Sequence, residues 1–276
     1  MDEATQFGFA NVNWNLISAE LRVQVLELSH QAKAAHLASA LSCIDILAVL
    51  YESILAFEPS NPNWPDRDRF ILSKGHAAAA LYAVLARQGI LDSSQLATYG
   101  KANSLLEEHP TPTLPGVEAA TGSLGHGLPI ANGIALASRI QKKSFRVFAL
   151  LSDGECNEGS VWEAAMFAAR HKLSNLCAIV DFNKWQATGR SQEVLALDPL
   201  ADKWRAFGWA VEEVDGHDHR QLESKLLAKP GQLPRMFIAH TVKGKGISFM
   251  EDDNNWHYRV PTREEINIAR VELGLA

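Results

Sequence analysis

One β-α-β pattern constrains the fold of this chain more than any other feature. A short apolar run, Arg146–Leu151, breaks at an acidic glycine turn, and a second apolar run, Leu176–Val180, follows further along the chain. Helix-forming residues fill the interval around Val161–Ala169. The pattern predicts two buried strands joined by a helix, and strands joined in this way run parallel. Parallel strands place their carboxyl ends on one edge of the sheet, which is where α/β proteins bind ligands.

Polar residues stand at the end of each of these strands. Asp153 lies in the turn after the first strand, and Asn183 follows the second. Carboxylate and amide oxygens suit Mg²⁺, with Ca²⁺ or Mn²⁺ as the other candidates. Gly154 lets the backbone approach a bulky anion, and the helix that follows offers its N-terminus to phosphate oxygens. These features predict a metal-bridged diphosphate site, although either residue alone also fits an ordinary turn or loop cap.

Composition narrows the class of protein. The chain has 276 residues, is 47% hydrophobic and 21% charged, and carries a net charge of −6. These values are typical of a globular protein, and the absence of a basic stripe makes nucleic acid an unexpected partner. Three cysteines show no paired spacing, the first residues are acidic, and no apolar run is long enough for a membrane span. We therefore expect a cytoplasmic protein with no membrane partner.

The rest of the chain fits a single α/β domain over residues 1–276, with residues 1–13 as a loose N-terminal lead. Further strands are expected at Arg69–Leu72, Ala210–Val214 and Arg235–Thr241, in alternation with helices. This alternation predicts a three-layer α/β/α fold with a mostly parallel sheet. Three helices are expected at Ala77–Arg87, 127–142 and 158–172. An amphipathic helix is expected from about Ile17, and a second helix is expected to be capped by Ser42 with Asp45. A last helix is expected to begin with a Thr262–Glu265 capping box.

Several other segments indicate function only weakly when each is taken alone. Residues 103–125 predict a long loop, and such loops are usually functional. The glycine cluster at 122–127 does not match the dinucleotide-binding fingerprint. Lys243–Gly246 is interpreted as a mobile surface loop. His217-Asp218-His219 is interpreted as a loop rather than a metal pair, because no third ligand is evident.

The block from Asp153 to Asn183 resembles the thiamine-diphosphate motif of the transketolase family, and the resemblance extends from about Leu16 to the C-terminus. It includes Lys74-Gly75-His76, His109-Pro110, Leu114–Glu118, Thr121–Gly125 and Trp256-His257. The resemblance implies the thiamine-diphosphate-binding fold, with Asp153, Asn183 and the backbone carbonyl of Trp185 as metal ligands. It implies cofactor contacts from His76, Gly122, Ser123, Leu124, Asp153, Gly154, Glu155, Asn183 and His257. It also implies catalytic roles for His36, His76, His109 and His257, since imidazoles exchange protons near neutrality.

The resemblance implies that half of the active site is missing from this chain. Transketolases carry the carboxylate that activates thiamine diphosphate on a second, pyrimidine-binding domain, followed by a third domain. The chain therefore resembles the N-terminal subunit of a split transketolase, which transfers a two-carbon ketol unit from a ketose to an aldose, phosphorylated or not. The expected partner is a separately encoded subunit with the pyrimidine-binding and C-terminal domains, in a heterotetramer.

Three alternatives remain open from the sequence. Two are thiamine enzymes that share the metal motif, namely the α subunit of a 2-oxo acid dehydrogenase and a deoxyxylulose-phosphate-synthase-like enzyme. Segments around His109, Leu114–Glu118 and His240–Gly246 favour transketolase over both. The third is a cofactor-binding module without catalytic activity.

Overall fold

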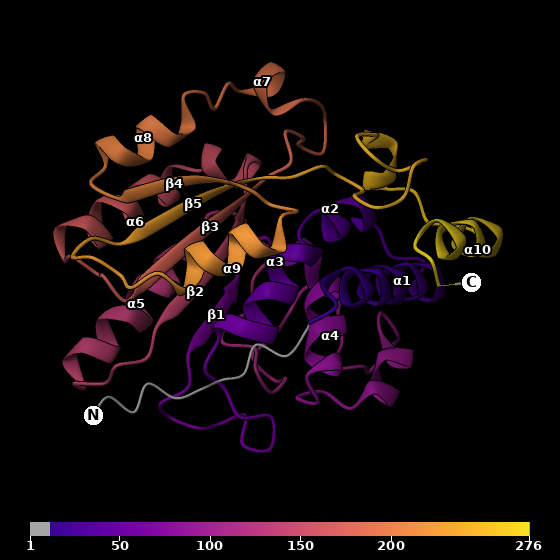
Figure 1. The fold of residues 1–276 in the computed structure, drawn as a ribbon, viewed down its shortest axis with the longest axis horizontal. Helices are drawn as coiled ribbons and strands as arrows, with labels where there is room; N and C mark the ends of the chain where they lie inside the picture. The colour runs from indigo at the N-terminus through magenta and orange to yellow at the C-terminus, as the bar shows by residue number, and fades with distance from the viewer. Residues whose placement is uncertain (1–11, 276) are drawn as a thin grey trace.

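A computed structural model describes residues 12–275 of the chain, and a five-stranded parallel sheet forms its centre (Figure 1). The strands lie in the order β1-β2-β3-β5-β4, and every neighbouring pair is parallel. Their bounds are β1 (Arg69–Leu72), β2 (Val147–Ser152), β3 (Leu176–Phe182), β4 (Ala210–Asp215) and β5 (Arg235–His240). The carboxyl ends of all five strands therefore lie along one edge.

Helices cover both faces of the sheet (Figure 1). The α-helices are α1 (Trp14–Ala32), α2 (Leu37–Ser42), α3 (Ile44–Val49), α4 (Ala78–Arg87), α5 (Gly127–Ile140), α6 (Gly159–Arg170), α7 (Ser191–Val194), α8 (Leu200–Ala206), α9 (His219–Leu227) and α10 (Arg263–Glu272). Short 3-10 or π segments are η1 (Leu50–Ile54), η2 (Gly75–Ala77), η3 (Ser93–Thr98), η4 (Gly154–Asn157) and η5 (Asn254–His257).

Alternating side chains of the strands fill two separate cores. On β2, Phe148 and Leu150 pack into the core shared with α1, α3, α4 and α9, whereas Val147, Ala149 and Leu151 pack against α5, α6 and α8. This two-residue alternation places a helical layer on each face of the sheet. The predicted three-layer α/β/α fold is confirmed.

Most of the predicted elements are also confirmed, with ends that move by one or two residues. β1 has the predicted bounds, the Thr262–Glu265 capping box begins α10, and 103–125 contains no helix or strand. The cap predicted at Ser42 is wrong, because Ser42 is the last residue of α2 and its hydroxyl donates to Asp181. Of the predicted N-terminal lead, residues 1–11 lie outside the described residues.

A buried ion pair joins the carboxyl ends of the strands. Lys74, just beyond β1, donates to Asp181 at the end of β3, and both side chains are fully buried. The Asp181 carboxylate also accepts from Ser42 on α2, at 2.6 Å, and from Thr241 after β5. Burial alone would lower the pKa of Lys74, but the charge of Asp181 holds it above its ordinary value. Lys74 is therefore a charged residue that connects three strand ends with α2.

Replacing Lys74 by methionine should lower the free energy of unfolding by about 3–5 kcal/mol, because it leaves a buried carboxylate without its cation. Urea unfolding of the isolated chain measures this loss. The double variant K74M/D181N should be more stable than K74M, since the uncompensated charge is then gone. A loss below about 1 kcal/mol for K74M, as for a surface pair, would contradict the structural role of this ion pair.

Candidate active site

The structure brings Asp153 and Asn183 to the same turn at the carboxyl edge of the sheet. Ser152 of β2 pairs with Asp181 of β3, so the residues that follow the two strands emerge side by side. Asp153 Oδ2 accepts from the backbone N–H of Lys184 at 2.8 Å, and Asn183 Oδ1 accepts from the N–H of Trp185 at 3.0 Å. Asp153 therefore lies beside the turn that begins at Asn183, as the strand topology predicts. Their role as metal ligands, together with Trp185, stays a prediction.

Asp153 differs electrostatically from its neighbour Asp181. Its side chain is fully buried and accepts from the Ser191 hydroxyl and the Gly154 N–H, each at 2.8 Å. No described lysine or arginine forms an ion pair with Asp153, whereas Asp181 has Lys74. Burial, with the nearby charge of Asp181, raises the pKa of Asp153 to about 6 despite the Ser191 hydrogen bond. A cation beside Asp153 would relieve this cost.

The surroundings of Asp153 fit a metal-bound diphosphate. The Gln186 Nε2 amide is buried without a hydrogen-bond partner among the described residues. A Cβ on Gly154 would lie 3.0 Å from Gln186 Cγ, so the amide stands directly beside the turn. A buried donor of this kind requires an acceptor, and a phosphate oxygen is one. In the described part of the chain no cluster of three or more His, Cys, Asp or Glu residues could hold a metal ion, but the predicted ligand set is of another kind.

The four histidines predicted to be catalytic lie together. The His36 ring is centred 5.4 Å from that of His76, 6.3 Å from that of His109 and 4.9 Å from that of His257. His36 Nδ1 and His257 Nε2 are 3.2 Å apart. Four separate segments of the chain therefore contribute imidazoles to one cluster. Its catalytic role stays a prediction.

Burial and neighbouring cations keep three of these imidazoles neutral. Burial, then the charge of Lys243, lowers the pKa of His257 to about 3. Burial and Lys74 hold the pKa of His76 well below its usual range, and burial with His109 lowers that of His36. A neutral imidazole can accept a proton at one nitrogen and donate from the other, which suits proton transfer among hydroxyl and carbonyl groups.

The glycine segment 122–127 packs closely against this cluster. A Cβ on Gly122, whose φ is +145°, would lie 2.8 Å from His109 Cδ2, and one on Gly75 would lie 2.7 Å from the Gly122 nitrogen. Glycine at both positions lets the backbone lie against the histidines. Ser123 is exposed and Leu124 half-buried. The cofactor contacts predicted for residues 122–124 are not tested by these contacts and stay predictions.

Glu155 forms a hydrogen bond with this glycine segment. Its buried carboxylate accepts from the Ser73 hydroxyl, from the Gly125 N–H at 2.8 Å and from the Ser152 N–H at 3.2 Å. A direct cofactor contact of Glu155 also stays a prediction. The helix expected after Asp153-Gly154 begins only at Gly159, because η4 intervenes.

The interpretation of Lys243–Gly246 as a mobile surface loop is wrong. Lys243 is fully buried, and its ammonium donates to Asn254 Oδ1 at 2.6 Å and to His257 Nδ1 at 3.0 Å. Burial and the charge of Lys74 lower the pKa of Lys243 to about 8. The sequence analysis named Lys74 only as part of the Lys74-Gly75-His76 match and gave it no role, and it missed Gln186 as part of the site.

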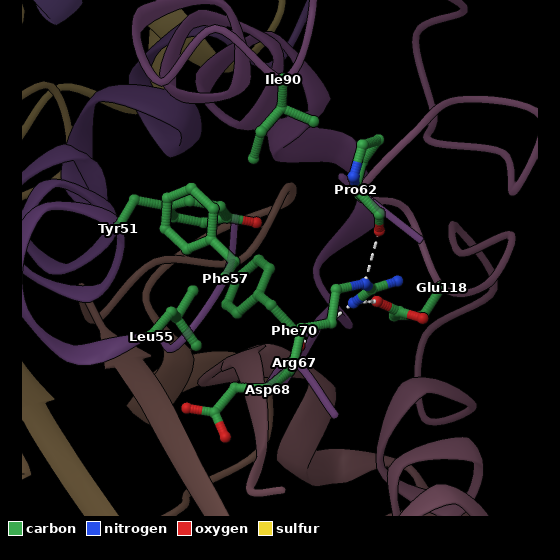
Figure 2. Close-up of a pocket in the computed structure, with 10 residues that line it drawn as sticks. Tyr51, Leu55, Phe57, Pro62, Arg67, Asp68, Phe70, Ile90 and Glu118 are labelled. Carbon is green, nitrogen blue, oxygen red and sulfur yellow. Dashed lines mark hydrogen bonds and ion pairs between the residues drawn. The ribbon is translucent and has the colours of Figure 1, made fainter. Parts of the chain in front are cut away.

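A cavity at the opposite edge of the sheet is not part of this site (Figure 2). Most of its lining residues precede or begin β1, and Ile90, Gly116 and Glu118 complete it. The Arg67 side chain reaches from the Pro62 carbonyl, at 2.6 Å, to Glu118. The cavity volume of about 20 Å³ admits a single water at most. The chemistry-bearing residues instead lie at the carboxyl edge, as expected for an open parallel sheet.

Comparison with known proteins identifies the family. The domain described as "Transketolase, thiamine diphosphate binding domain" matches residues 14–276. The chain therefore belongs to the transketolase family, as its N-terminal, thiamine-diphosphate-binding part, and the predicted resemblance is confirmed. The transketolase of Campylobacter jejuni has the same fold, with a TM-score of 0.90 and 29% identity over 96% of this chain and 43% of its own.

The relatives fall into two kinds by length. An apulose-4-phosphate transketolase subunit of Phocaeicola vulgatus is 40% identical over 94% of this chain and 93% of its own length. A 6-deoxy-6-sulfo-D-fructose transketolase subunit of Clostridium sp. is 39% identical over 91% and 97%. Human transketolase is 40% identical over 86% of this chain, but over 38% of its own length. The chain thus matches subunits almost completely and spans about two fifths of single-chain transketolases. No helix in the described part is both long and apolar enough to cross a membrane.

The acid sensitivity of the chain should depend on His257. The ordinary histidine pKa of 6.5 applies to the unfolded state, whereas the pKa of folded His257 is about 3. Between these values the unfolded state binds more protons, so stability is lost as the pH falls below 6.5. His257→Asn should therefore lose less stability than the wild type between about pH 7.5 and about pH 5 in urea unfolding. His126→Asn, at an exposed position, serves as the matched control, and equal losses in all three proteins would contradict the assignment.

Proposed function

We propose that this chain is the N-terminal subunit of a two-component transketolase and forms one diphosphate-binding domain. The observation that carries the proposal is the convergence of Asp153 and Asn183 on one turn, at the same sheet edge as the four-histidine cluster. The near-complete match to relatives that are named as transketolase subunits supports it. The reaction is transfer of a two-carbon ketol unit from a ketose to an aldose.

Mg²⁺ is the proposed metal, with Ca²⁺ or Mn²⁺ as substitutes, held by Asp153, Asn183 and the Trp185 carbonyl. The buried Asp153 carboxylate, which lacks a cation among the described residues, supports this assignment. Thiamine diphosphate, when bound, supplies the electron sink for the two-carbon unit. The diphosphate is proposed to lie beside Gly154 and the Gln186 amide, with His76, His257 and residues 122–124 around the cofactor.

The chain's own residues orient the reactants and manage protons. His36, His76 and His257 are neutral in this cluster, so together with His109 they can hydrogen-bond sugar hydroxyl groups and exchange protons with them. Lys243 can hold a proton at Nζ against His257 Nδ1. Glu155 is proposed to act through the Gly125 N–H, by keeping the glycine segment against the site.

The partner is proposed to be a separately encoded subunit with the pyrimidine-binding and C-terminal domains, in a heterotetramer with two copies of each. The match to relatives named as transketolase subunits, which covers almost their whole length, supports this proposal. Substrates are sugars or sugar phosphates. The two subunit relatives are named for different substrates, so overall identity does not select one of them. The cytoplasm is the proposed location, in keeping with three free cysteines.

The test is Asp153→Ala in the reconstituted complex. The partner is identified by co-purification, and ketol transfer is then assayed with and without thiamine diphosphate and Mg²⁺. The variant should bind the cofactor at least about 100-fold more weakly in calorimetry, because the metal loses its carboxylate, while still associating with the partner. Asp202→Ala, an exposed aspartate on α8, is the matched control.

Unchanged cofactor affinity in Asp153→Ala would remove the metal assignment. Cofactor binding without ketol transfer in the wild-type complex would instead favour a non-catalytic module. Transfer from a 2-oxo acid, but not from a ketose, would favour the other thiamine enzymes.

A further inference from the structure

A buried polar cluster around Asp45 contacts the segment that carries Lys243. Asp45 on α3 accepts from both terminal nitrogens of Arg22 on α1, at 3.0 and 2.6 Å. His217 Nδ1 is 2.7 Å from Asp45 Oδ2, and His219 Nε2 is 3.0 Å from Asp45 Oδ1. Asp45 is 2% exposed and Arg22 5% exposed. The histidine pair that the sequence predicts as a loop feature is therefore built into a hydrogen-bonded network around one carboxylate.

The protonation of this network follows from its contacts. His217 Nε2 accepts from the backbone N–H of Val242 at 2.9 Å, so its proton lies on Nδ1 and is donated to Asp45. Burial alone would raise the pKa of Asp45, but the charge of Arg22 and the hydrogen bonds from His217 and His219 hold it well below its usual range. Arg22 and Asp45 thus form a buried ion pair, and His217 connects Asp45 to the backbone N–H of Val242.

The segment 242–246 is fixed from several sides. Arg22 Nε donates to the Lys245 carbonyl at 2.8 Å, while Gly244 N–H donates to the Ala38 carbonyl at 3.0 Å. Gly246 has φ +94°, and a Cβ there would lie 2.8 Å from Arg22 Cδ. The same Arg22 and Asp45 thus hold the segment at Lys245 directly and at Val242 through His217. Lys243 lies between these two points and faces the histidine cluster.

We propose that Arg22, Asp45 and His217 are positioning residues of the active site, which hold the backbone on both sides of Lys243 so that its ammonium reaches His257 Nδ1. None of the three touches the histidine cluster in the contacts described, so they act through residues 242–246. The inference deepens the proposed function, but it concerns contacts within this chain. Its test needs neither cofactor nor partner, so either proposal can fail without the other.

The test uses ¹⁵N NMR of the histidine imidazoles in the isolated chain, with the His257 Nδ1 signal as the readout. Lys243→Met gives the signal expected when the ammonium contact is lost. His217→Asn keeps an amide donor for Asp45, but its side chain is too short to accept from Val242. It should move the His257 Nδ1 signal in the same direction as Lys243→Met and accelerate amide hydrogen exchange at Val242.

Two further variants separate positioning from general damage. His217→Gln places an amide oxygen near the position of Nε2, so it should move the signal part of the way back to the wild-type position, because the contact with Val242 is regained and the donor to Asp45 is not. His219→Asn is the matched control, because His219 shares the contact with Asp45 but not the one with Val242. It should leave the His257 signal in place. Thermal melting confirms that each variant is folded at the temperature of measurement.

The outcomes decide the proposal. A wild-type His257 signal in His217→Asn, while Lys243→Met moves it, would overturn the inference. So would a His219→Asn shift as large as that of His217→Asn, or an unmoved signal in Lys243→Met. Should His217→Asn fail to fold, Asp45→Ala breaks the same chain of contacts, since it removes the oxygen that accepts from His217 Nδ1, and the same shift is expected.

Discussion

The buried ion pair between Lys74 and Asp181 holds together the edge of the sheet on which the site depends. Each charge alone would be costly to bury, and the pair is stable only because its geometry is fixed and its remaining hydrogen-bonding positions are satisfied. Ser42, Thr241 and the Ser39 carbonyl meet that need. These partners come from the end of β5 and from α2, the helix that follows His36. The ion pair thus sets where the strand ends and the first histidine lie relative to one another.

Two neighbouring buried carboxylates have opposite electrostatic surroundings. Asp181 is neutralised by Lys74, whereas Asp153, one strand away, has hydrogen-bond donors but no cation among the described residues. The raised pKa of Asp153 reports that imbalance. Because Lys74 already neutralises Asp181, Asp153 is the carboxylate that an added cation would stabilise. The Gln186 Nε2 atom beside it is buried without a hydrogen-bond partner in the described part of the chain, which points to an anion in the same place. Together they support the proposed site for a cation bound to an anionic group.

Much of this arrangement could be predicted from the chain itself. The β-α-β pattern located the turn after β2 and the end of β3, because buried strands and a helix-rich interval leave a strong periodic signal. The family resemblance located the histidines, which the structure indeed gathers around His36. The prediction for Lys243 failed because a Lys-Gly-Lys-Gly sequence is typical of an exposed loop, and only packing shows that its first lysine is buried. The prediction for Ser42 failed because a local capping pattern competes with a distant carboxylate, Asp181, which a local pattern cannot reveal.

The sequence by itself determined the fold class, the edge of the sheet that bears the site and the residue types available there. These follow from local periodicity and from strand topology, which depend on short-range order in the chain. The tertiary structure alone decided which charges are paired and which amide nitrogen has no partner within residues 12–275. It alone decided that His217 and Asp45 reach the segment bearing Lys243. Those relations join residues that are far apart in sequence, and their energies depend on burial and distance, which no local pattern contains.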